Sequence, residues 1–242
     1  MTTQEFSDTF DTLLNSYGTQ PQFGNASSAY NIVLDEYEKS LFLSQAQEEL
    51  VLSLYTGRNA SGKSFEGTEE ERRNLSNIVK EAKLYPITTT NGSPLGMGSK
   101  SKFFTLPEDL WFITYESVTL SKGKCSENAV MQVYPVKQDE YQVIKNNPFR
   151  GANDRRALRL DLSEGNVEVI CKYTVKDYYI RYVKKLKPII LENLSDGLSI
   201  DNETQRTECE LNPALHRRIL DRAVMLAITS KTYNSSRENR NS

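Results

Sequence analysis

The hydrophobic period of this sequence changes twice, and these changes constrain the fold more than any other feature. Before residue 86, apolar residues recur three and four apart, as in Leu43, Ala46 and Leu50, which is typical of amphipathic helices. From Ile87 onward, short β-branched and aromatic runs bounded by turn residues predict strands. Helical spacing returns after Asn212. Strands grouped apart from helices along the chain indicate an α+β fold.

We expect the N-terminal helices and the C-terminal helix to form a helical bundle, with an antiparallel β-domain inserted between them. The predicted parts are a helical region at 1–86, a β-rich domain at 87–206, a C-terminal helix at 207–231 that returns to the bundle, and a flexible tail at 232–242.

Capping signals predict where the first long helices begin. Ser44 followed by Gln47 is a capping box, so a helix is expected over residues 44–56. A second box starts at Thr68, and the apolar stripe after it predicts a helix that ends just before Pro86.

The central region contains seven runs with strand character. These are residues 87–90, 103–105, 112–118, 130–134, 157–162, 167–173 and 178–183. Short strands in close succession indicate an antiparallel sheet rather than a doubly wound one. One short helix is expected among them, over residues 137–146.

Composition narrows the class of protein. Hydrophobic residues make up 38 % of the chain, a low share that suits either a soluble protein with much surface or one whose surface is completed by neighbours. No apolar run approaches the roughly 20 residues that span a bilayer, and the first residues lack the pattern of a signal peptide. We therefore expect a soluble chain, neither secreted nor bound to a membrane. Cys125, Cys171 and Cys209 are too few and too scattered to predict disulfides or a zinc site.

Charge is distributed unevenly along the chain. Residues 1–50 carry eight acids and one base, whereas residues 172–187 carry six bases and one acid. Segments of opposite charge favour docking between copies or between different partners. Two solvated faces with no binding role are the alternative interpretation.

The segment Gly57–Ser64 matches the phosphate-binding pattern G-x-x-x-x-G-K-S. A nucleotide site would use Gly57, Gly62, Lys63 and Ser64, and this is one alternative function. A working loop of this kind follows a buried strand and opens a helix. Here a helix is predicted before Gly57, so the segment is better interpreted as an exposed connection between helices, and no cofactor is expected.

The remaining candidates for chemistry are few. His216 is the one histidine, and its spacing from Cys209 and Glu210 fits no zinc pattern. No partner for a nucleophilic pair lies near it in the sequence. We predict no catalytic and no metal-binding residues.

A loop around residues 146–156 combines an aromatic residue with arginines: Phe149, Arg150, Arg155 and Arg156. Both residue types are enriched at protein interfaces. Because arginine also pairs with phosphate, nucleic-acid binding through this loop is a further alternative. The net acidic chain has no continuous basic stripe, which favours a protein partner.

Four stretches, in this order, resemble the ring or adaptor proteins in the head-to-tail connector of crAss-like, short-tailed bacteriophages. They are residues 34–51, residues 64–73, the loop 147–150, and residues 207–211 leading into His216. The resemblance is discontinuous but spans residues 34 to 230.

The resemblance implies a virion structural protein without catalytic residues, made in the host cytoplasm and built into the tail. It implies a ring of about twelve copies that closes through heterologous contacts. Its partners would be the portal protein and neighbouring tail rings, and the genome would pass through the lumen without sequence-specific contact. The acidic first fifty residues and the basic segment with Lys184, Lys185 and Lys187 are candidates for the docking surfaces.

Overall fold

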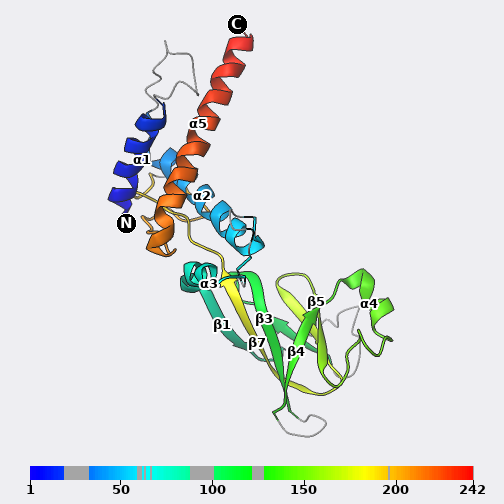
Figure 1. Cartoon of the computed structure of the whole chain (residues 1–242). Helices are drawn as coiled ribbons and strands as arrows, with labels where there is room; N and C mark the ends of the chain where they lie inside the picture. The colour runs from blue at the N-terminus through cyan, green and yellow to red at the C-terminus, as the bar shows by residue number, and fades with distance from the viewer. Residues whose placement is uncertain are drawn as a thin grey trace. The chain divides into compact units, whose positions relative to one another are not determined.

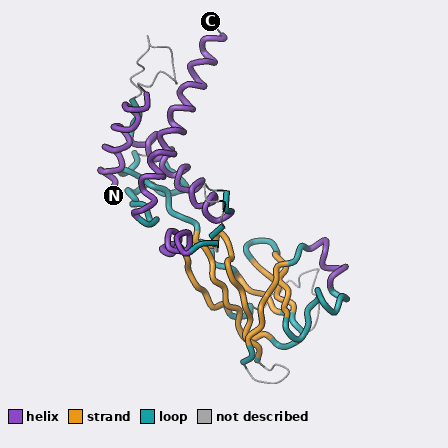
Figure 2. Tube along the Cα trace, viewed as in Figure 1, coloured by secondary structure: helices purple, strands orange, loops and turns teal. Residues whose placement is uncertain are grey.

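The computed structural model describes residues 1–18, 33–58, 62, 64–65, 67–87, 101–121, 128–195 and 197–241, with side chains up to residue 230. Across these residues the chain is a mixed α+β protein with five α-helices and a seven-stranded sheet. It divides into a helical unit, Met1–Ile78 with Leu186–Ser242, and a β unit, Val79–Lys185. Figure 2 shows most helices in one unit and the strands in the other.

The helical unit is built around one long C-terminal helix. Its elements are α1 (Thr3–Gly18), α2 (Glu36–Thr56), α3 (Glu69–Leu75), a 3-10 turn at Pro213–Leu215, and α5 (His216–Asn241). α5 packs along both α1 and α2 (Figure 1). Their shared core is apolar and buried, and includes Phe6, Phe10, Leu43, Leu54, Leu220 and Val224. The backbone of the stretch predicted as a flexible tail continues α5 up to Asn241.

The predicted start of α2 at Ser44 was wrong, because the helix begins earlier, at Glu36. Asp35 caps it: Asp35 Oδ1 accepts from the Glu38 amide at 2.6 Å, and the Glu38 side chain accepts from the Asp35 amide. Ser44 lies buried within the helix, and its hydroxyl accepts from the Ile189 amide at 3.0 Å. The S-x-x-Q pattern therefore marks a tertiary contact instead of a helix start.

The second predicted helix was right at its start and wrong at its end. Thr68 caps α3, but the helix ends at Leu75 and a 3-10 turn follows. The next residues form strand β1 (Val79–Leu84), which pairs with β7. The spacing of apolar residues in this stretch suits a helix, but hydrogen bonds to a strand distant in sequence decide its conformation. Local periodicity does not reveal such a partner.

The β unit is one sheet in the order β1-β7-β3-β4-β5-β6-β2. Its further strands are β2 (Lys102–Thr105), β3 (Leu110–Leu120), β4 (Val130–Pro135), β5 (Arg156–Asp161), β6 (Asn166–Ile170) and β7 (Val175–Lys184). Ile87, the one described residue of the first predicted strand, donates its amide to Phe103 O at 2.8 Å. This bridge brings the chain after β1 to the free edge of β2, so the sheet curls.

The prediction of a purely antiparallel sheet was wrong at one pairing, since β4 and β5 run parallel. Parallel neighbours need a crossover of a dozen or more residues. Helix α4 (Gln138–Ile144) and the loop after it supply this crossover. The short predicted helix over residues 137–146 is thus the element that makes the parallel pairing possible.

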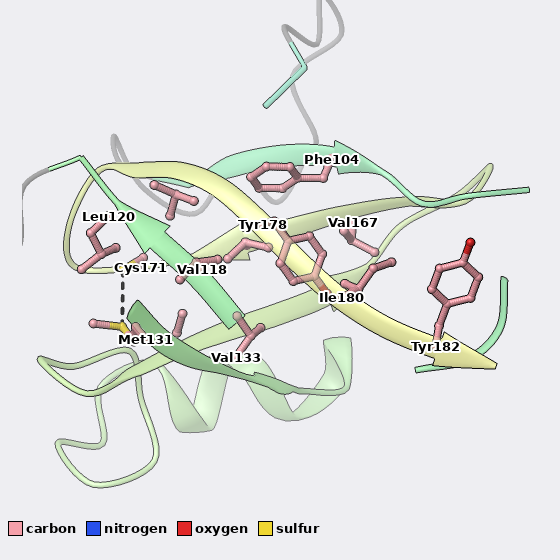
Figure 3. Packing of buried hydrophobic residues seen from close by; sticks show 13 residues of the cluster. Phe104, Val118, Leu120, Met131, Val133, Val167, Cys171, Tyr178, Ile180 and Tyr182 are labelled. Atoms are coloured by element: carbon pink, nitrogen blue, oxygen red, sulfur yellow. Dashed lines mark hydrogen bonds between the residues drawn. The ribbon is translucent and has the colours of Figure 1, made fainter. Parts of the chain in front are cut away.

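The β unit has two clusters of buried residues, a larger one that includes Phe104, Tyr178 and Ile180 and a smaller one in which Tyr141 of α4 packs with Leu158, Leu160 and Ile170. Phe104 and Tyr178 pack with ring centroids 5.2 Å apart, and the Cys171 sulfur lies 3.7 Å from that of Met131 (Figure 3). Among the described residues, no helix combines the length and apolarity needed to cross a membrane.

Candidate assembly surface

The loop after α4, residues 147–156, is held in shape by its own polar groups, and we call it the Phe149 loop. Asn147 Oδ1 accepts from the backbone amides of Phe149 at 2.8 Å and Arg150 at 3.0 Å. Asn153 Nδ2 donates to Pro148 O at 3.2 Å. The loop therefore has one defined conformation without any partner.

Gly151 is required for this conformation because the backbone folds closely over it. Its amide donates to Asn147 O at 2.7 Å. A Cβ at this position would lie 2.7 Å from the same oxygen and 3.0 Å from Ile144 O. Any larger residue would have to displace backbone.

Charged contacts attach the loop to the sheet. Asp154 Oδ1 accepts from Lys172 Nζ at 2.7 Å and from Tyr173 Oη at 2.9 Å. The Arg156 guanidinium lies 4.2 Å from the centre of the Tyr134 ring, and its Nη1 donates to Phe149 O at 3.3 Å. Arg156 thus supports the loop from within the unit.

Three side chains of the Phe149 loop, an aromatic residue and two arginines, remain exposed. Phe149 is 84 % exposed, and its ring makes no contact within the described residues that would require an aromatic side chain there. Arg150 and Arg155 are exposed beside it in sequence, and the described residues include no carboxylate partner for either. A fixed loop that presents an exposed aromatic residue and arginines is typical of a binding hot spot.

The basic segment predicted as a second surface includes residues of both units. Lys184 and Lys185 belong to the β unit and Lys187 to the helical unit. Lys187 is neutralised within its own unit by Glu203, with 3.1 Å between Nζ and Oε1. The structure thus gathers Phe149, Arg150 and Arg155 in one loop, and the three lysines stay candidates for a second surface.

Three of the eight acids of the first fifty residues form ion pairs within the helical unit. Lys39 is 4 % exposed and pairs with Asp11 at 2.7 Å and Glu36 at 2.9 Å, which ties α1 to α2. Glu49 pairs with Arg222 of α5 at 2.6 Å. Arg222 is thus the described base from outside this segment that pairs with one of its acids, so most of the segment's negative charge remains.

The phosphate-binding pattern lacks the strand that such a loop needs. Gly57 ends α2 in the left-handed conformation, with φ 77°, so the first glycine caps a helix. Lys63 lies outside the described residues. Gly62 also has positive φ, and Ser64 O accepts from the Gly67 amide at 2.7 Å.

The connection after α2 is anchored by a residue that the pattern does not indicate. Phe65 is 2 % exposed, and its amide donates to Tyr55 O at 3.4 Å. A lone aromatic residue among polar neighbours was the available sequence signal for this anchor.

His216 takes part in hydrogen bonds that hold the helical unit together, and Cys209 is partly buried in the same unit. Because a carbonyl only accepts, His216 Nε2 carries the proton and donates to Leu211 O at 3.2 Å, leaving Nδ1 to accept from the amino group of Met1 at 3.0 Å. Burial raises the pKa of the Cys209 thiol to about 11, so it stays protonated at neutral pH. The described residues contain no cluster of metal ligands.

A surface on α2 was missed in the sequence. Leu41 and Leu52 are each 40 % exposed, on the side of the helix away from the buried stripe. Their spacing of eleven residues, three helical turns, was the signal that could have shown a second apolar face.

The described residues thus combine an ordered loop that exposes Phe149 with a histidine and a cysteine held in structural contacts. The chain belongs to the phage tail ring protein 3/4 family, whose model matches residues 1–239. It is 49 % identical over 235 residues to "Ring protein 3" of Bacteroides phage crAss001, covering 96 % of this chain and 97 % of that protein.

A second protein of the same phage, "Ring protein 4/5", is 30 % identical over 236 residues, covering 94 % of this chain and 92 % of that protein. The predicted resemblance to ring proteins of crAss-like phages is therefore confirmed. These relatives are structural ring proteins of phage tails, and the chain is not an enzyme.

Proposed function

We propose that this protein is a ring subunit of the head-to-tail connector in a crAss-like phage, joins portal and tail, and lets the genome pass through its lumen. Family membership supports a ring, and the observation that carries the proposal is the Phe149 loop. It is folded without a partner and leaves an 84 % exposed phenylalanine at the surface. A surface of this kind is consistent with burial against another protein.

The ring would close through heterologous contacts between about twelve copies, because a head-to-tail contact with the right rotation generates a closed ring. In this proposal α1, α2 and α5 form a helical bundle that supports one side of the contact, and the β unit supplies the other. The subunits would be made in the host cytoplasm and assemble into the virion.

The degree of similarity suggests a place in the stack. Identity is 49 % to "Ring protein 3" and 30 % to "Ring protein 4/5" of crAss001. We place this chain at the position of the former, with the portal protein or another tail ring as its neighbours along the channel.

Electron microscopy of the purified protein, alone and with the portal protein of the same phage, tests the proposal. We expect rings with a central opening that stack coaxially with the portal. Particles that remain monomeric and never join a portal would contradict it.

Charge reversal at Lys184, Lys185 and Lys187 tests the basic segment separately. If that segment docks to an acidic partner, the triple substitution weakens assembly or stacking. Rings and stacks unchanged by it would restrict the interface to other surfaces.

A further inference from the structure

We propose that the Phe149 loop of one copy docks into a hollow on α2 of the neighbouring copy, and that this contact closes the ring. The inference rests on the proposed function and names the two surfaces that would meet. It concerns contacts between copies only.

The hollow combines apolar and acidic residues, which are the groups that could bind an aromatic ring and arginines. It encloses about 440 Å³ and belongs entirely to the helical unit. Its apolar residues are Leu41, Phe42 and Ile200, and its acids are Glu38, Glu48 and Asp201. Phenylalanine would bury its ring among the former, and the arginines would lie against the latter.

Among the apolar residues of the hollow, Ile200 is buried, Phe42 is half-buried and Leu41 is exposed. The core side of α2 carries Leu43, Leu50 and Leu54, all buried. Leu41 lies on the other side and is 40 % exposed. A helix that is apolar on a second face is typically packed on that face as well.

The two surfaces carry opposite charges, and two of the three acids of the hollow are available for contact. Glu48 and Asp201 form no ion pair with any described residue, in contrast to Glu49, which pairs with Arg222. Arg150 and Arg155 likewise have no described acidic partner. Opposite charges that are unpaired in the subunit are available for contact across an interface.

Both surfaces are preformed. Asp201 is held at φ 50° in a tight turn closed by backbone hydrogen bonds between Ile200 and Glu203. The Phe149 loop is fixed by Asn147 and Gly151. Preformed surfaces lose little conformational entropy on binding.

The two surfaces differ, which is what a closed ring needs. A loop on the β unit and a hollow on the helical unit of the same chain make a heterologous contact, so each copy offers one of each to its neighbours. The test therefore uses one variant with a disabled loop and one with a disabled hollow.

Phe149→Asp disables the loop, and Leu41→Asp disables the hollow. Each variant alone should associate at least about 30-fold more weakly than wild type. A side chain at the centre of an interface is typically one of the few residues that contribute most of the binding free energy. Mixed together, they retain one intact loop and one intact hollow. The mixture should yield one-to-one dimers and nothing larger in sedimentation velocity.

Val130→Asp is the matched control, since Val130 is 69 % exposed on β4, outside the loop; it should assemble as wild type. Circular dichroism checks that all variants are folded. Rings from either disabled variant, or a mixture without dimers while wild type forms rings, would overturn the inference and leave the proposed function intact. A wild type that never forms rings would contradict the proposed function itself.

If the Phe149 loop binds a different partner, the same variants give distinct results. Variants that form normal rings but fail to stack on the portal would assign the loop to a different protein. Normal rings with loss of salt-sensitive DNA binding would assign it to nucleic acid. Either result would overturn docking between copies.

Discussion

His216 connects the start of α5 to the first residues of the chain and stays neutral to do so. Burial is the main cause that lowers its pKa below the ordinary 6.5, and the nearby amino group of Met1 adds to the effect. Its ring also packs on Phe6, with centroids 5.1 Å apart. A protonated ring could not accept from the amino group.

Acid should therefore destabilise the helical unit through this residue. The unfolded chain takes up a proton as the pH falls below about 6.5, whereas the folded chain does so only at lower pH, so stability is full above this value and is lost below it. Urea unfolding followed by far-UV circular dichroism between pH 7.5 and 5 measures the loss. His216→Gln, which keeps a donor for Leu211 O, should show a flatter dependence. Equal slopes for both proteins would contradict this assignment.

Lys39 is the buried charge that joins α1 to α2. Burial alone would lower its pKa, but the hydrogen bonds to Asp11 and Glu36 outweigh it and raise the pKa. Lys39→Ala leaves the Glu36 carboxylate without its cation and should reduce the free energy of unfolding by about 2 kcal/mol. Arg72→Ala removes an exposed pair with Glu69 and should cost less than about 1 kcal/mol. Urea unfolding measures both losses. If the two variants lose similar free energies of unfolding, burial does not make the Lys39 pair more stabilising than the exposed pair.

At the scale of elements, the Phe149 loop depends on its glycine. Gly151→Ala forces a Cβ to within 2.7 Å of Asn147 O, so the loop must shift. We expect a loss of about 1–2 kcal/mol in stability, as for other overpacked sites, together with association weakened as in Phe149→Asp. Sedimentation velocity checks the association. Wild-type assembly by the folded variant would mean that the shape of the loop does not matter.

The curled sheet contains a cluster of three buried polar side chains that the sequence did not indicate. Tyr178 Oη donates to Glu116 Oε2 at 2.5 Å, and Arg159 Nη1 lies 3.5 Å from the same oxygen. Burial raises the pKa of Glu116, and the charge of Arg159 offsets part of this rise. The three residues come from β3, β5 and β7, so their contact depends on the strand order.

Removing one member of this group should cost more than removing the ion pair. Glu116→Ala removes the buried counterion of Arg159 and leaves only the exposed Asp161 carboxylate, 3.2 Å from its Nε, so it should destabilise the β unit by about 3 kcal/mol. Glu116→Leu combined with Arg159→Met replaces the pair by apolar side chains and should cost less. Fluorescence of Trp111, the one tryptophan, on β3, reports unfolding of this unit. A double variant less stable than the single one would contradict the argument.

For the whole molecule, the sequence sufficed for the α+β class and for the positions of most strands, because alternation and helical spacing are local. It did not suffice for β1, nor for the parallel pairing of β4 with β5, since both depend on partners distant in sequence. For the candidate surface, the exposed Phe149 and its arginines were visible in composition. The hollow on α2 required Ile200 and Asp201 to come beside the helix.

The mass distribution of the purified wild-type protein shows whether this chain closes into a ring. Native mass spectrometry over a range of concentrations should show monomers and one large discrete oligomer with few intermediates, because the last contact of a closed ring needs no further copy. Monomers at all concentrations, or a continuous series of sizes typical of open filaments, would contradict closure into a ring.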